Sequence, residues 1–254
     1  TGTSNTALGT LALRANTTSG SNTAVGYIAL CANTTGASHV AIGRSALEDN
    51  TTGEYSTAVG RSALANNTTA SNNTAVGYQS LFTNTTGTQN TALGYQAMLL
   101  NTSDNNTAVG GCAMICNTSG STNTAIGQGA LHCNTSGSEN TAAGRRALYY
   151  NTTGTCNIGV GRDALYVNTT GNQNTAVGRS ALNANTSGTD HVAIGFCALA
   201  DNTTAIRNVA IGSYTLRDNT TGTLNVAVGM AALTNVTTGS DNTGVGDCAG
   251  QALT

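Results

Sequence analysis

Residues 73–89 read N-T-A-V-G-Y-Q-S-L-F-T-N-T-T-G-T-Q, and this 17-residue unit returns along the whole chain. The glycine that closes the T-A-V-G segment recurs from Gly9 to Gly246, and 13 of its 14 spacings are 17 residues. The remaining spacing, from Gly94 to Gly110, is 16 residues, and the lost residue falls in a polar loop. An internal repeat with a fixed period is the signature of a repeat architecture, so its length is the strongest indication of the fold.

The length of the unit favours a β-solenoid. Helical-hairpin repeats need about 30 residues or more, and a Gly, Asn and Thr in every unit disfavour a helix interior. At ~3.3 Å per extended residue, a coil of this length has a perimeter below roughly 55 Å. We predict an all-β, parallel β-solenoid (β-roll) of about 15 coils, which forms one tandem-repeat domain over residues 1–254 and is a segment of a longer array.

Positions within a coil are numbered here as offsets from the repeat glycine. In a strand, offsets −3 and −1 share one face and offsets −2 and 0 share the other. The usual Thr at −3 becomes aliphatic at Val40, Ile158 and Val192, which predicts that −3 and −1 point into the core. The opposite face is Ala and Gly, so we expect another backbone to approach it closely, from the same coil or from a neighbouring chain.

Composition excludes several classes of function. Only 8% of the 254 residues are charged, the net charge is −2, and Pro and Trp are absent. This charge balance argues against partners such as nucleic acid or an anionic membrane surface. The apolar runs are too short for a membrane span. The chain opens in polar residues, so we expect any signal peptide to lie outside this sequence.

Asparagine at offset +7 opens an N-x-[ST] triplet in almost every coil, and two interpretations stay open. One is N-glycosylation, and the other is a ladder of stacked amides. Val236 interrupts the column, yet Asn235 keeps an acceptor triplet one residue earlier, which favours the glycan. The asparagines at −4 lie in N-T-A and suit a ladder. The glycosylation candidates are Asn16, Asn33, Asn50, Asn67, Asn84, Asn101, Asn117, Asn134, Asn151, Asn168, Asn185, Asn202, Asn219 and Asn235.

The cysteines and histidines indicate little chemistry. Cys116 and Cys133 share offset +6 on adjacent coils, where Cα atoms about 5 Å apart would allow a disulfide. No C-x-x-C motif occurs, and His39 and His191 replace the Asn at −4 as polar turn substitutions. No set of side chains forms a catalytic constellation. We therefore expect no enzymatic activity, no cofactor and no metal.

Two strings carry a family resemblance. His39-Val40-Ala41-Ile42-Gly43 resembles the S-V-A-I-G core of the head repeats of trimeric autotransporter adhesins. Residues 73–81, N-T-A-V-G-Y-Q-S-L, are similar to the N-T-A-V-G-Y-Q-A-L arrays of phage and viral tail-fibre-like proteins. The resemblance implies a left-handed parallel β-roll, three chains side by side, and display at a surface for attachment.

The resulting functional expectation is a structural extracellular fibre or surface-attachment protein, at a cell or virion surface. Its partners would be itself, as a homotrimer or an end-to-end fibre, and covalent glycans or a cell-surface ligand. Arg and Tyr alternate at offset +1, as at Tyr27, Arg44 and Arg61, and suit contacts between chains or stacking on glycans. The alternative is an ice- or glycan-binding solenoid. A β-helix enzyme acting on polysaccharides is the least favoured class.

Overall fold

The computed structural model describes residues 2–253 and contains two compact units, Thr1–Asn123 (unit 1) and Thr124–Thr254 (unit 2). Within the described residues every regular element is a β-strand of three residues, and there is no helix. The strands of unit 1 are β1 (Thr6–Leu8), β2 (Thr23–Val25), β3 (Val40–Ile42), β4 (Thr57–Val59), β5 (Thr74–Val76), β6 (Thr91–Leu93) and β7 (Thr107–Val109). Those of unit 2 are β8 (Thr124–Ile126), β9 (Thr141–Ala143), β10 (Ile158–Val160), β11 (Thr175–Val177), β12 (Val192–Ile194), β13 (Val209–Ile211), β14 (Val226–Val228) and β15 (Thr243–Val245).

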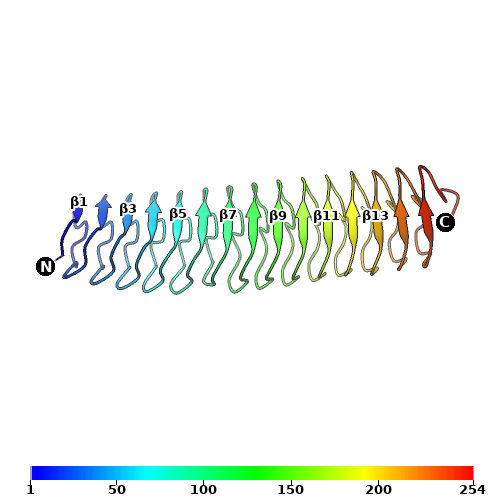
Figure 1. Ribbon diagram of the computed structural model, residues 1–254. Coiled ribbons are helices and arrows are strands. Elements are labelled where there is room, and N and C mark those ends of the chain that lie inside the picture. The colour runs from blue at the N-terminus through cyan, green and yellow to red at the C-terminus, as the bar shows by residue number, and fades with distance from the viewer. Residues whose placement is uncertain (1, 254) are drawn as a thin grey trace. The chain divides into compact units, whose positions relative to one another are not determined.

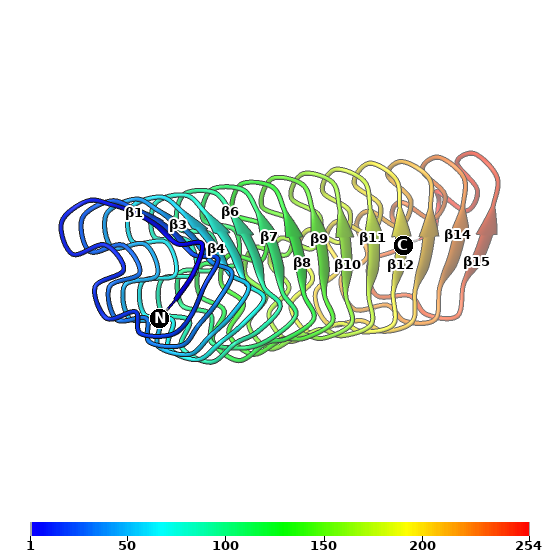
Figure 2. The ribbon, with the colours of Figure 1, turned by 60° about the vertical axis from the view of Figure 1, so that its left-hand side comes forward.

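Each unit is a parallel β-solenoid, as predicted, in which each coil contributes one strand to a single sheet (Figures 1 and 2). Ala176 of β11 pairs with Gly159 of β10 on one side and with Ala193 of β12 on the other, so equal offsets stack directly. The 16-residue spacing does not disturb this register, because Thr91 of β6 still pairs with Thr107 of β7. The missing residue is absorbed in the turn.

The two faces of the strands are the reverse of the prediction. Ala176 at offset −2 is fully buried, whereas Thr175 and Val177 at −3 and −1 are only half-buried. The interior is filled by Ala at −2 and +3 and by Leu at +4, for example Ala164 and Leu165, both 0% exposed. A Cβ placed on Gly159, which holds offset −2 in its coil, would already lie 3.3 Å from Cγ of Leu148 at offset +4, so the interior has room for little more than a methyl group at −2.

The predicted close approach of another backbone is found at offset 0, but it comes from the next coil of the same chain, which was not among the predicted sources. At offset −2 the near neighbours include a Leu side chain, as Leu148 is for Gly159. Gly144 has a φ of +137°, and a Cβ placed on it would lie 2.7 Å from the carbonyl oxygen of Gly161. Real Cβ atoms do not approach backbone atoms that closely. Gly at this position is therefore required twice, by its backbone conformation and by its neighbour.

In most coils three further corners use left-handed backbone at residues other than glycine, while Gly129 and Gly250 hold one such corner in their coils. In the coil around β11 these are Gln173, Ser180 and Leu182, with φ of 57°, 58° and 51°. This conformation costs about 1–2 kcal/mol per residue. It is offset here because the N–H of each of the three donates to a carbonyl of a neighbouring coil, at 3.0 Å.

Candidate functional site

The asparagines at offset +7 form a buried ladder. Asn168 Nδ2 donates to Asn151 Oδ1 at 2.8 Å and to the carbonyl of Gly171 at 3.0 Å. Asn185 repeats the pattern one coil later and donates to Asn168 Oδ1 at 2.8 Å. Both hydrogens of each amide are thus used inside the solenoid, where an unpaired amide would cost about 1–3 kcal/mol.

The ladder is interrupted where the repeat is irregular. Among the described residues, Asn84 Oδ1 and Asn219 Oδ1 are the buried side-chain oxygens with no hydrogen-bond partner. Asn84 precedes the 16-residue spacing, and Asn101 Nδ2 turns to the carbonyl of Ser103 instead. Asn219 precedes Val236, a buried aliphatic residue that has no amide to donate. Each irregularity in the sequence thus leaves one acceptor unsatisfied.

This geometry supports the ladder interpretation over the glycan interpretation. A glycan would be joined through Nδ2, and a coil that buries and hydrogen-bonds this nitrogen has no room for one. Asn16 is half-buried, whereas Asn235 is exposed and donates to the carbonyl of Gln251 at 2.7 Å, so at Asn235 glycosylation stays a prediction. The remaining candidates are all fully buried: Asn33, Asn50, Asn67, Asn84, Asn101, Asn117, Asn134, Asn151, Asn168, Asn185, Asn202 and Asn219.

A second buried column, at offset −4, explains the two substituting histidines. Asn174 Oδ1 accepts the backbone N–H of His191 at 3.1 Å, and Asn174 Nδ2 donates to the carbonyl of Gly188 at 2.9 Å. His191 makes the equivalent contacts with its ring. Its Nδ1 accepts the N–H of Asn208 at 3.1 Å, and its Nε2 lies 2.7 Å from the carbonyl of Ala205. His191 is therefore a buried amide substitute and not a turn residue.

The hydrogen bonds of the histidines assign their tautomer. A backbone N–H can only donate, so Nδ1 of His191 carries no proton and Nε2 carries it. His39 follows the same pattern with the N–H of Ser56 at 3.2 Å and the carbonyl of Gly53 at 2.6 Å. Burial, the largest cause, lowers the pKa of His191 from 6.5 to about 4 and also lowers the pKa of His39. Both rings are neutral at physiological pH.

Outside the solenoid, the strands present what we call the outer strand face, formed by offsets −3 and −1. In unit 1 every strand except β3 begins with Thr. In unit 2, β10, β12, β13 and β14 begin with Val or Ile instead. Aliphatic side chains in these columns are half-buried or exposed, and the exposed ones include Leu93 (45%), Ile126 (48%) and Ile158 (42%). Straight columns of exposed apolar side chains are typical of an interaction surface.

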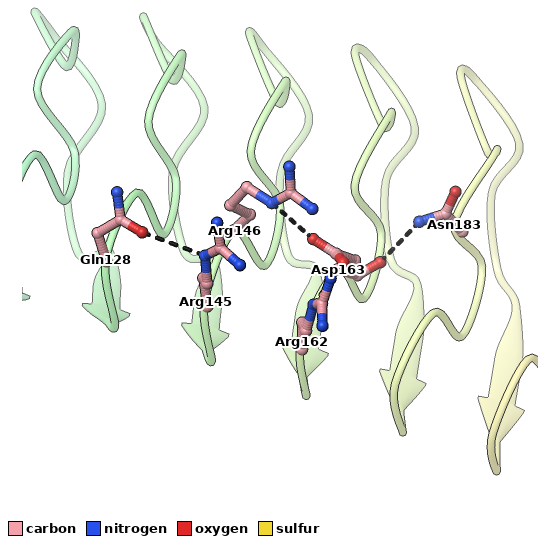
Figure 3. A network of polar contacts seen from close by, with 6 residues as sticks. All are labelled: Gln128, Arg145, Arg146, Arg162, Asp163 and Asn183. Carbon is pink, nitrogen blue, oxygen red and sulfur yellow. Dashed lines mark hydrogen bonds and ion pairs between the residues drawn. The ribbon is translucent and has the colours of Figure 1, made fainter.

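A second external feature, which we call the Arg–Tyr cluster, lies in unit 2 and consists of His132, Arg145, Arg146, Tyr149, Tyr150, Arg162, Asp163 and Tyr166. Figure 3 shows its polar part. Arg146 Nε and Arg162 Nε lie 2.9 and 3.1 Å from the two carboxylate oxygens of Asp163. The alternation of Arg and Tyr at offset +1 already indicated Arg145 and Arg162, which belong to that column. The missed signal was the run of His132, Tyr149 and Tyr166 at offset +5 of consecutive coils.

The other sequence predictions find less support. Cys116 lies in unit 1 and Cys133 in unit 2, so their disulfide stays a prediction, and burial raises the pKa of the Cys116 thiol. Over residues 2–253, no three His, Cys, Asp or Glu side chains gather as a metal site would need. The described part of the chain also contains no helix long and apolar enough to cross a membrane.

The sequence matches no known protein-family model and, to a significant degree, no curated protein. The interpretation of both external surfaces therefore depends on their geometry and chemistry.

Proposed function

We propose that this chain is a structural repeat segment of an extracellular fibre or surface-attachment protein, of the adhesin or tail-fibre kind. The observation that carries the proposal is the outer strand face. The interior columns are filled by the chain's own Ala, Leu and Asn, while the outward columns hold aliphatic side chains in register that are half-buried or exposed. The solenoid thus presents a regular, flat surface of the kind that a second copy of the same repeat can cover.

The energetics favour self-association over an isolated chain. Burying apolar surface contributes about 25 cal/mol per Å², and the same contact would be repeated at each coil, about 4.8 Å apart. Because the repeat of a second copy has the same spacing, successive coils of two chains can be in contact at once. A homotrimer with the outer strand faces turned toward one another buries these columns, and an end-to-end fibre extends them.

Sedimentation velocity of the chain tests the proposal. We expect the wild type to sediment as a trimer, and the double variant Ile194→Glu/Ile211→Glu to sediment as a monomer with an unchanged circular dichroism spectrum. Ile194 and Ile211 are adjacent exposed residues of β12 and β13. The control, Ser187→Glu/Thr204→Glu, adds the same charge at two exposed turn positions of adjacent coils and should leave the trimer intact. A monomeric wild type would contradict the proposal.

Ice binding is a second candidate, because one observation favours it. The Thr at offset +8 is engaged, since Thr51 Oγ1 donates to the carbonyl of Thr68 at 3.0 Å. The Thr at −3, by contrast, points outward from a flat sheet in unit 1, and Thr74 and Thr91 are exposed there. If this column of outward Thr side chains binds ice, the chain shows thermal hysteresis, and the variant Thr74→Lys/Thr91→Lys abolishes it. Hysteresis absent from the wild type removes this candidate.

A further inference from the structure

The Arg–Tyr cluster concentrates positive charge in a chain that has little. Arg145, Arg146 and Arg162 are three of the nine basic residues of the chain, and they lie on two adjacent coils. Two of them share a single carboxylate, Asp163, which is itself nearly buried and is held in place because its main-chain carbonyl accepts from Asn183 Nδ2 at 3.0 Å. Arg145 Nε donates to the neutral Gln128 Oε1 at 3.2 Å (Figure 3). The three guanidinium groups therefore exceed their carboxylate partner by two charges.

An aromatic surface adjoins these charges. Tyr149 stacks on His132 with ring centroids 4.6 Å apart, and it lies 4.8 Å from Tyr150 and 5.6 Å from Tyr166. Tyr150 and Tyr166 meet edge to face at 5.1 Å. These side chains are all half-buried or exposed, so their rings form one continuous patch on the outside of the solenoid.

Arg146 joins the charged and the aromatic parts. Its guanidinium carbon lies 4.9 Å from the centroid of the Tyr166 ring, while its Nε binds Asp163. The hydrogen bonds of Arg146 and Arg162 to Asp163 are both made by Nε, and not by the terminal nitrogens of the two guanidinium groups (Figure 3). These terminal nitrogens are positioned to bind an anion in the two-pronged geometry that guanidinium groups favour.

We propose that the Arg–Tyr cluster binds an acidic saccharide, with the sugar ring on the Tyr149, Tyr150 and Tyr166 patch and its carboxylate or sulfate at Arg146 and Arg162. Tyrosine presents an apolar ring for the C–H face of a sugar together with a polar hydroxyl for its alcohols. The adjacent guanidinium groups select the anionic group. This inference rests on the surface-attachment role proposed above and names the class of ligand that such attachment would use.

The rest of the chain offers a matched control. Arg44 lies 5.8 Å from the ring centroid of Tyr27, which is also a cation–π pair between coils. Arg61 and Tyr78 follow Arg44 at the same offset of the next two coils, and Arg61 lies 5.7 Å from the centroid of the Tyr78 ring. In the part of the chain that the structure describes, no carboxylate forms an ion pair with Arg44 or Arg61, and offset +5 of their coils holds Glu48 and Ala65 in place of aromatic rings. This column has cation–π pairs without the adjoining aromatic patch and should not bind a saccharide, so Arg44→Gln separates the effect of the cluster from the loss of one positive charge.

Calorimetric titration with defined probes tests the proposal. The probes are 3′-sialyllactose for the carboxylate, a heparin-derived hexasaccharide for the sulfate, and lactose as the neutral control. We expect the wild type to bind at least one acidic probe and not lactose. Arg146→Gln and the exposed-site variant Tyr150→Ser should each weaken binding about tenfold or more, while Arg44→Gln should leave it unchanged.

Three results would overturn the inference: no binding of either acidic probe, equal binding of lactose, or equal losses in Arg146→Gln and Arg44→Gln. The same samples, followed by sedimentation velocity, keep the two proposals apart. A trimer that binds no saccharide refutes the inference alone, whereas saccharide binding by a monomer refutes the self-association and leaves the site in place.

Discussion

The inner and outer sides of a single strand differ sharply in how much they vary. On β11, Ala176 points inward and is fully buried, while Thr175 and Val177 point outward and are half-buried. The inward columns hold the same residue in nearly every coil, and the outward columns change between Thr, Val and Ile, or between Arg, Tyr and Gln. The interior specifies the coil, and the outside is where this chain differs from one coil to the next.

The largest expected effect is a difference in the free energy of unfolding between the same Leu→Ala substitution made inside and outside the solenoid. Leu165→Ala removes a fully buried side chain at offset +4 and should lower the free energy of unfolding by roughly 2–5 kcal/mol. Leu224→Ala removes the same atoms from a 48% exposed position and should cost less than about 1 kcal/mol. Urea unfolding followed by circular dichroism measures both. Equal costs would mean that the interior is not where the structure places it.

Acid should weaken the interior through its histidines. Folding keeps His191 neutral with a pKa of about 4, whereas the unfolded chain takes up the proton with a pKa near 6.5. The unfolded state therefore binds more protons as the pH falls from 6.5 to 4, and about 3 kcal/mol of stability is lost over that range. Above pH 6.5 this contribution is constant.

The matched control replaces both histidines by the usual residue of their column. His39→Asn/His191→Asn should keep the hydrogen bonds and lose much less stability than the wild type between pH 7 and pH 4. Urea unfolding at several pH values measures the difference. The same pH profile for both proteins would show that the rings are not the buried neutral acceptors described above.

Within one N-x-[ST] triplet of the ladder, a substitution of the buried Asn should lower the stability of the fold, whereas a substitution of the exposed Thr should not. Asn168→Ala orphans Asn151 Oδ1 and should cost roughly 1–3 kcal/mol. Thr170→Ala destroys the same N-x-[ST] triplet at an exposed position and should change stability little. Thermal unfolding compares the two variants. A mass loss on deglycosylation in the wild type that Thr170→Ala abolishes would instead restore the glycan interpretation at this coil.

The smallest effect concerns the left-handed corners. Gln89 is exposed and has a φ of 57°. Glycine adopts that conformation without the cost of about 1–2 kcal/mol. Part of the gain is lost again, because glycine loses more backbone entropy on folding than glutamine does. Gln89→Gly should therefore stabilise the fold by about 0.5–1 kcal/mol in urea unfolding. The control is Thr86→Gly, at an exposed position of the same coil without a positive φ, and it should destabilise the fold.

The coil length and register were predictable because the repeat glycine and its neighbours recur at one period. The assignment of faces failed at Val40 and Ile158, because an aliphatic side chain tolerated at −3 shows only that the face is not fully solvated. Ala points inward because Leu at +4 packs against the strand from inside the coil. This Leu has a left-handed backbone conformation, which no local sequence pattern predicts.

The candidate sites were less predictable for a related reason. The triplets of the +7 column look the same whether Asn points inward or outward, so the sequence alone left the glycan and the ladder open. His191 resembles a polar turn residue until its two ring nitrogens are seen to replace an amide. Tyr149 and Tyr166 meet only because their coils are adjacent, and variation in their column hid that contact.

The fold described above requires the asparagines at +7 to lie inside the solenoid, and hydrogen exchange of their side-chain amides tests this directly. In a sample labelled with ¹⁵N at Asn, the Nδ2 hydrogens of Asn151, Asn168 and Asn185 should exchange on the order of 1,000-fold more slowly than those of a short peptide. The exposed Asn235 provides the internal reference. Exchange of all these amides at the peptide rate would contradict the account.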